Sequence, residues 1–188
     1  MRAQPAGARR DGCGRHRLLA LGARGHAPPL QAALALADEA GDRRLLAEAL
    51  YNAGFAPLER FTDQAERYRE GRPYFEKSLA IYRELEDRAG EAGALWALAG
   101  SLAAHGDREG YLEMAGQSLE LSRELGDPFR TGWGAHMVGL AHMGGGRLRE
   151  AVEAFRESLD MWVSAGDRSG ILLLLGDIST LARLRGDE

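Results

Sequence analysis

The sequence predicts an all-α protein in which antiparallel helix pairs stack one on another, and three observations support this fold class. First, three similar segments recur at a constant interval, at 78–90, 118–130 and 158–170 (SLAIYRELEDRAG, SLELSRELGDPFR and SLDMWVSAGDRSG). Second, turn residues recur at half that interval along the chain. Third, apolar residues between the turns are spaced three and four apart, which is typical of helices that bury one face.

The turns define the length of each helix. A turn residue stands at every twentieth position from 86 to 186, namely Glu86, Gly106, Gly126, Gly146, Gly166 and Gly186, and Asp follows five of these six. Glycine adopts the left-handed conformation that ends a helix, and Asp accepts hydrogen bonds from the amides that open the next helix. Each half-repeat is therefore one helix of about four turns, and two consecutive helices form an antiparallel hairpin.

The individual elements follow from this period, and we call the first helix of each pair helix A and the second helix B. A fourth copy of the pattern at 33–44 stands further from the copy at 78–90 than the period requires, so a short insertion is expected in the first unit. The predicted elements are an unpaired helix B at 28–40, the pairs 43–58 with 73–86, 88–105 with 108–125 and 128–144 with 147–165, and a last helix A at 168–184. Pro73 and Pro128 are expected at helix starts, where a missing amide costs nothing. Segment 59–72 is predicted to be an inserted loop with room for an extra helical turn.

The residues of the third pair follow a known family pattern. Val138 and Gly139 in helix A, and Ala151, Phe155 and Ser158 in helix B, stand in the order and spacing of that pattern. They resemble the tetratricopeptide repeat family, over residues 28–188. The resemblance implies a right-handed superhelical solenoid with helices A on its concave face.

The match is degenerate in places. Tyr111 stands where the family usually has a small Ala, and His142 where it usually has Tyr. The repeat period is about 40 residues, in place of the usual ~34 residues, which is similar to the longer repeats of large bacterial regulators. Those regulators are ATPase-type transcriptional activators and cyclase-linked signalling proteins.

Residues 1–27 form a basic head that is rich in Gly and Arg. Its apolar run, Leu18 to Leu21, is too short for the core of a signal peptide. A basic arm for nucleic acid or membrane lipid is one interpretation. The interpretation we prefer is a disordered start.

Composition excludes several classes of function. The 188 residues include 24 basic and 28 acidic side chains, a net charge of −4, which argues against direct binding of nucleic acid. Cys13 is the single cysteine, so neither an internal disulfide nor a cysteine-based zinc site is expected. The longest aliphatic run, Ile171 to Leu175, is far shorter than the ~20 residues that span a bilayer. We expect a soluble, cytoplasmic protein.

No motif predicts catalysis, a cofactor or a metal site. The segment from Gly71 to Ser78 nearly fits a phosphate-binding loop, but Glu76 stands in place of its second glycine and would repel phosphate. A metal pair on one helix needs a spacing of three or four, whereas His136 and His142 are six residues apart and face different ways. The sequence therefore indicates a protein that is not an enzyme.

The family resemblance implies a partner-binding groove along helices A. Its positions map to Tyr51, Asn52, Phe55, Trp96, Trp133, His136, Met137 and Met143, followed on the last helix by Asp177, Thr180 and Arg183. Apolar side chains in such a groove suit an extended or helical peptide. The alternative is that these aromatic residues pack against neighbouring helices. A clamp for a peptide's carboxylate is not expected, because Asn52 has no groove lysine beside it.

These observations predict a non-catalytic protein–protein interaction module that binds a peptide or a partner domain in the concave groove. One alternative is an effector-sensing segment of a larger ATPase-type or cyclase-linked regulator. Another is self-association through the last helix, whose apolar residues Ile171, Leu172, Leu174, Leu175, Ile178 and Leu181 have no following helix B in the predicted array.

Overall fold

The computed structural model describes residues 30–55 and 64–186, and in these ranges it contains eight α-helices and no strand. The predicted basic head, residues 1–27, lies outside the described residues. The helices are α1 (Leu30–Glu39), α2 (Arg43–Phe55), α3 (Gln64–Glu84), α4 (Arg88–Ala104), α5 (Arg108–Glu124), α6 (Pro128–Gly144), α7 (Leu148–Ala165) and α8 (Arg168–Arg185). The predicted all-α class is confirmed.

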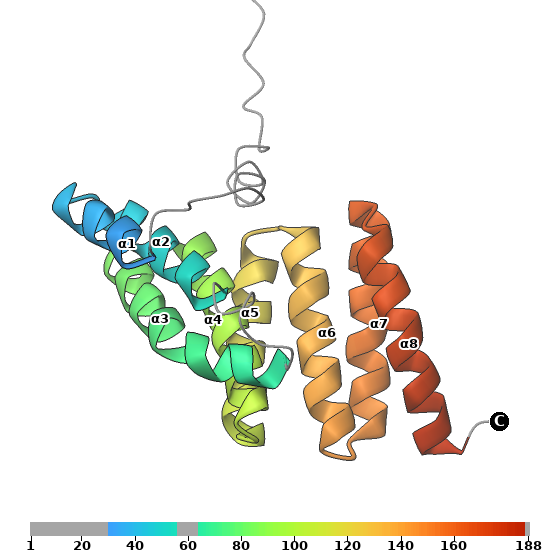
Figure 1. Ribbon diagram of the computed structural model, residues 1–188. Coiled ribbons are helices and arrows are strands. Elements are labelled where there is room, and N and C mark those ends of the chain that lie inside the picture. The colour runs from blue at the N-terminus through green and yellow to red at the C-terminus, as the bar shows by residue number, and fades with distance from the viewer. Residues whose placement is uncertain (1–29, 56–63, 187–188) are drawn as a thin grey trace, which may run out of the picture.

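Each helix packs on the next one along the chain, from α1 to α8 (Figure 1). In addition, α4 contacts α6 and α6 contacts α8, so helices A also touch across the helix B between them. As a result α1 and α8 lie at opposite ends of the molecule (Figure 1). None of the described helices has the length and apolar character needed to cross a membrane.

The predicted turns and caps are confirmed. Gly106, Gly126, Gly146, Gly166 and Gly186 all have φ between 62° and 77°. The carboxylates of Asp87, Asp107, Asp127 and Asp167 accept hydrogen bonds from amides in the first turn of the following helix, at 2.9–3.2 Å. The regular spacing of glycine and aspartate therefore sets where most of these helices begin and end.

Glu86 is the exception at this turn position, because it adopts the left-handed conformation without being glycine (φ 53°). A Cβ atom in that conformation costs about 1–2 kcal/mol. We therefore expect Glu86→Gly to raise the free energy of unfolding by about 1 kcal/mol. Urea unfolding checks this, with Gly106→Ala as the matched reverse change, expected to lower stability by a similar amount. A destabilised Glu86→Gly variant would contradict the assignment.

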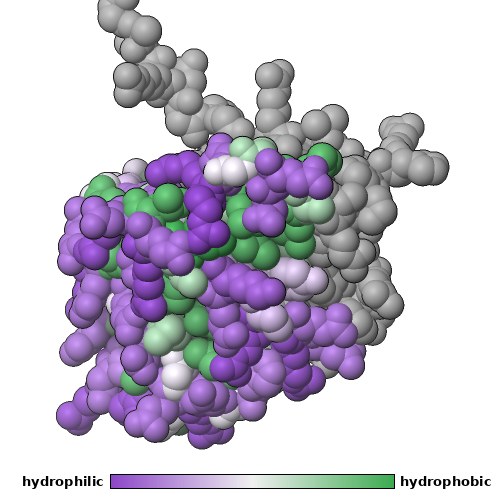
Figure 2. Space-filling view, turned by 90° about the vertical axis from the view of Figure 1, so that its left-hand side faces the viewer, coloured by the Kyte–Doolittle hydropathy of each residue, from purple (hydrophilic) through white to green (hydrophobic). Residues whose placement is uncertain are grey.

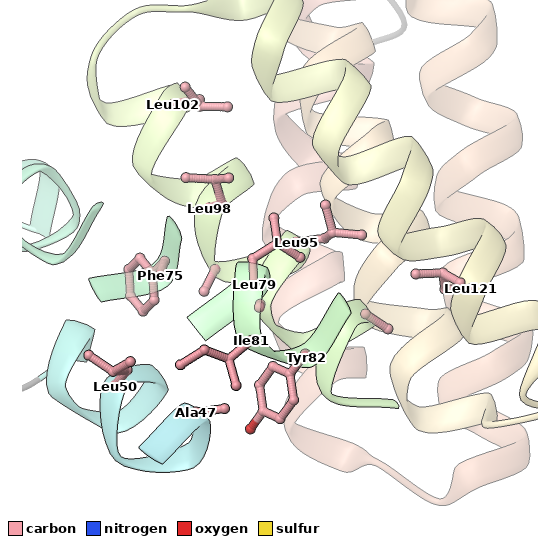
Figure 3. Packing of buried hydrophobic residues seen from close by; sticks show 13 residues of the cluster. Ala47, Leu50, Phe75, Leu79, Ile81, Tyr82, Leu95, Leu98, Leu102 and Leu121 are labelled. Carbon is pink, nitrogen blue, oxygen red and sulfur yellow. The ribbon is translucent and has the colours of Figure 1, made fainter. Parts of the chain in front are cut away.

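In two of the helix pairs, a glycine on helix A leaves room for an aromatic ring on helix B. A Cβ atom on Gly54 of α2 would lie 2.3 Å from the Phe75 ring of α3, and one on Gly139 of α6 would lie 2.4 Å from the Phe155 ring of α7. Phe75 and Phe155 are buried. Phe75 belongs to a core cluster that draws residues from α2, α3, α4 and α5 (Figure 3). A large side chain on helix B therefore requires glycine on helix A.

A serine on helix B makes a second recurring contact. Ser78 Oγ donates to the carbonyl of Ala47, and Ser118 Oγ, at the same point of the next repeat, donates to the carbonyl of Ala92, both at 2.8 Å. Ser158 Oγ is buried at the same register and has no hydrogen-bond partner among the described residues. The first two pairs thus share a polar contact that fixes the register of helix B on its own helix A.

The prediction of an inserted loop at 59–72 is wrong from residue 64 onward, because α3 begins at Gln64 and contains Pro73 in its interior. Proline inside a helix costs about 3 kcal/mol, so packing has to offset it. A Cβ atom on Gly71 would lie 2.2 Å from the Gly54 carbonyl oxygen, which shows how closely α3 approaches α2 before the proline. The rest of 59–72 lies outside the described residues.

Candidate functional site

Four aromatic side chains on successive helices A form one continuous series, which we call the aromatic row. It consists of Tyr51 and Phe55 of α2, Trp96 of α4 and Trp133 of α6, all half-buried. The ring centroids are 5.2 Å apart for Tyr51–Phe55, 6.4 Å for Phe55–Trp96 and 5.9 Å for Trp96–Trp133. Four of the predicted groove residues therefore contact one another in a series that crosses three helices.

Fully buried rings on helices B pack against the buried side of the row. The Phe75 centroid is 4.8 Å from that of Phe55, and the Trp162 centroid is 5.1 Å from that of Trp133. Phe75 and Trp162 have no solvent exposure. Rings fixed in this way lose little further freedom when a ligand covers them.

The prediction that His136 lines an open groove is wrong. His136 is 4% exposed, and its Nε2–H donates to the Asp177 carboxylate of α8 at 2.7 Å. Its ring also packs beside those of Trp133 and Trp162, with centroids 6.0 and 5.4 Å away. Because α8 packs on α6, this position is enclosed, and His136 joins the last two helices A instead of facing a ligand.

The other predicted groove residues have different surroundings. Asn52 is exposed, and its amide donates to the Glu48 carbonyl in the same helix at 2.8 Å. Met137 is half-buried, and the Tyr111 hydroxyl of α5 donates to its sulfur at 3.6 Å. Met143 is half-buried and packs against the core cluster of α7 and α8.

Sequence reasoning missed two tyrosines, of which Tyr68 contacts the row and Tyr111 contacts Met137. Tyr68 of α3 packs on Phe55, with centroids 6.2 Å apart, and its ring fills the space in which a Cβ on Gly100 of α4 would lie. Tyr68 could not be identified from the sequence, because its segment is polar and is predicted to be a loop. Tyr111 is visible only as a departure from the family's small residue at that position.

Burial keeps these hydroxyl groups neutral. It raises the pKa of Tyr51 to about 12, with a smaller contribution from Tyr68 that outweighs the opposite effect of Arg130. Burial also raises the pKa of Tyr68 and Tyr111, and Tyr68 and the Asp177 carboxylate raise that of Tyr111 further. The surface around the row is therefore aromatic and hydroxyl-bearing, without charge on its tyrosines at neutral pH.

The raised pKa of Tyr51 predicts a specific alkaline instability. Below pH 10 the phenol is neutral in both folded and unfolded chains, so its contribution to stability is complete there. Between pH 10 and about pH 12 the unfolded chain ionises first, so stability falls as pH rises. We expect Tyr51→Phe to recover about 2 kcal/mol near the top of this window and to change stability little at neutral pH. Urea unfolding at both pH values checks this, and equal effects at both would contradict it.

The remaining chemical features of the described residues concern metal ligands, a histidine with a shifted pKa and a groove. No three His, Cys, Asp or Glu side chains among them converge as metal ligands. Burial, and then the neighbouring Arg147, lowers the pKa of His142. A groove of about 350 Å³ lies between α7 and α8, lined by Val152, Phe155, Arg156, Leu159, Ile178, Leu181, Ala182 and Arg185.

Comparison with known proteins assigns no family to the chain: no protein-family model matches it, and no curated protein matches it. What the site binds therefore has to follow from its own chemistry. That chemistry is a rigid row of partly exposed aromatic rings with neutral hydroxyl groups beside it.

Proposed function

We propose that the protein is a non-catalytic protein–protein interaction module and that the aromatic row binds a peptide or a segment of a partner protein. The observation that carries this proposal is the continuity of Tyr51, Phe55, Trp96 and Trp133 over three helices. Tyr and Trp contribute most of the binding energy in many protein interfaces, because they bury a large area at a low cost in conformational entropy.

We further propose that the helices form a tetratricopeptide-like, right-handed solenoid with the row on its concave side. Contacts that recur with the repeat support this arrangement. Arg43, which opens α2, pairs with Glu84 at the end of α3, and Arg88, which opens α4, pairs with Glu124 at the end of α5. In such a stack all helices A share one face, and a ligand that crosses them meets the row along its length.

The spacing of the row favours an extended peptide. Neighbouring rings on different helices are 6.4 and 5.9 Å apart. Alternate side chains of an extended strand point the same way and recur about every 6.6 Å. A segment with apolar residues at alternate positions would therefore place them over successive rings. The Tyr68 hydroxyl beside Phe55 can form a hydrogen bond with the backbone of such a peptide.

A peptide library displayed on particles, selected against the whole chain, tests this proposal. We expect the selected peptides to carry alternating apolar residues, and we expect Trp96→Ala with Trp133→Ala to weaken their binding by at least about a hundredfold. Val163→Ala is the matched control, because Val163 is 61% exposed on α7 and is not part of the row. Circular dichroism and thermal unfolding verify that each variant is folded. Unchanged binding by a folded double variant would refute the proposal.

A further inference from the structure

The last helix exposes a stripe that the other helices A bury. On α4 the stripe consists of Ala92, Leu95 and Ala99, which are 2%, 0% and 0% exposed. Helix α5 lies beside it, since the Ser118 hydroxyl of α5 donates to the Ala92 carbonyl. The corresponding residues on α6 are also buried, and Gly139 there meets Phe155 of α7.

On α8 the same stripe falls two repeats after that of α4, at Leu172, Leu175 and Ser179. Leu172 is 69% exposed and Leu175 is 56% exposed, and Ser179 is exposed as well. Among the described residues no helix B covers this side of α8. The stripe is thus the A-helix half of a contact that α4 and α6 each make completely.

The first helix exposes the opposite half of this contact. Ile81 of α3 and Leu121 of α5 occupy one register on helix B and are buried, and Ile81 lies in a cluster with Ala47 and Leu50 of its own helix A (Figure 3). The corresponding residue of α1 is Leu36, which is 62% exposed. The next residue, Ala37, is buried, because α1 packs on α2 with its other side. Figure 2 views this end of the molecule and shows apolar surface among polar residues there.

The exposed faces of α1 and α8 also carry opposite charges, at positions that form ion pairs inside the repeat array. The residue that opens helix A pairs with a glutamate at the end of its own helix B in Arg43–Glu84 and in Arg88–Glu124. The corresponding residues at the two ends of the molecule are Arg168, which opens α8, and Glu39, which ends α1. Both are exposed, and neither has an ion-pair partner among the described residues.

We infer that the protein associates head to tail with a second copy of itself, in which α1 of the second copy docks on α8 of the first as α5 docks on α4. Leu36 of one copy is then buried against the stripe of Leu172 and Leu175 on the other, and Glu39 pairs with Arg168. The two surfaces differ, so each copy keeps one free end and further copies can add. This contact is separate from the aromatic row and does not depend on what the row binds.

Two single variants of the full chain test the inference by sedimentation velocity and light scattering. We expect the unmodified protein to form dimers and longer species as its concentration rises. Leu36→Asp and Leu175→Asp each remove one of the two surfaces, so each variant alone is expected to be monomeric. A mixture of the two variants still contains one intact pair of surfaces and is expected to form dimers that do not grow further.

Charge reversal gives an independent check, because both residues are exposed and their replacement leaves the core unchanged. Arg168→Glu and Glu39→Arg are each expected to weaken association by about tenfold, and the two changes together in one chain are expected to restore it. Val163→Asp is the matched control at an exposed apolar site elsewhere.

Three outcomes would overturn the inference. The first is an unmodified protein that stays monomeric at its highest soluble concentration. The second is a folded Leu36→Asp variant that still dimerises, which would indicate a symmetric contact of α8 with α8. The third is a mixture of the two aspartate variants that remains monomeric while each variant is folded by circular dichroism.

Discussion

Replacing Phe155 by alanine is expected to lower the free energy of unfolding by about 3–5 kcal/mol. The ring is 2% exposed and fills the space over Gly139, where no side chain exists to replace it. The change therefore leaves a cavity between α6 and α7. Urea unfolding followed by circular dichroism measures the loss.

The same pair of residues supports a double-mutant cycle. Gly139→Ala alone places a Cβ atom 2.4 Å from the Phe155 ring and is expected to cost about 1–3 kcal/mol. The two changes together recreate an alanine pair, which the second unit already has at Ala99 and Ala115, both buried. We expect the double variant to lose at least about 1 kcal/mol less than the sum of the single losses.

Gly116→Ala is the matched control for this cycle. Gly116 lies within α5, and a Cβ atom there would have no heavy atom outside its own helix turn within 4 Å. Alanine at this position is expected to stabilise the helix by up to about 1 kcal/mol. Additive losses for Gly139 and Phe155 would contradict the matched-size explanation of how helices A and B fit.

The second large effect is expected at Trp162, which joins three helices. Its ring occupies the space in which a Cβ on Gly132 of α6 or on Gly170 of α8 would lie, at 2.5 and 2.4 Å. It is fully buried and also contacts the rings of Trp133 and His136. We expect Trp162→Ala to cost about 3–5 kcal/mol and to loosen α8 more than the helices before it.

Hydrogen exchange resolved along the chain checks both parts of this prediction. Amides of α8 are expected to lose more protection than those of α4, which is remote from Trp162. The neighbouring change Val163→Ala, at an exposed site, is expected to alter stability by less than about 0.5 kcal/mol. Uniform loss of protection along the chain would contradict the role assigned to Trp162 as the attachment of α8.

The helix boundaries were accessible from the sequence because they depend on local backbone chemistry. Glycine at C′ positions and Asp at N-caps act within a few residues, so their regular spacing placed α4 to α8 closely. The start of α3 was not accessible, because it depends on tertiary contacts. Pro73 signals a helix start locally, whereas the approach of Gly71 to Gly54 and of Tyr68 to Phe55 stabilises the helix before it.

The candidate site was predictable only in part, for a related reason. A position on the inner side of helix A can face solvent or the next helix A, and the sequence pattern of one helix does not separate these cases. Trp96 and Trp133 remain partly exposed, whereas His136, which corresponds to Trp96 in the next repeat, is covered by Asp177 and α8. Burial there depends on how α8 packs, which no single repeat encodes.

The measurement that tests the proposed binding surface most directly is ¹⁹F NMR of the chain labelled with fluorotryptophan, with and without a selected peptide. Trp96 and Trp133 are partly exposed and Trp162 is fully buried, so only the first two signals should shift when H₂O is replaced by D₂O. If the aromatic row binds the peptide, both signals lose their solvent shift in the complex and Trp162 does not change. Solvent shifts that persist for Trp96 and Trp133 in the saturated complex would contradict the row as the binding site.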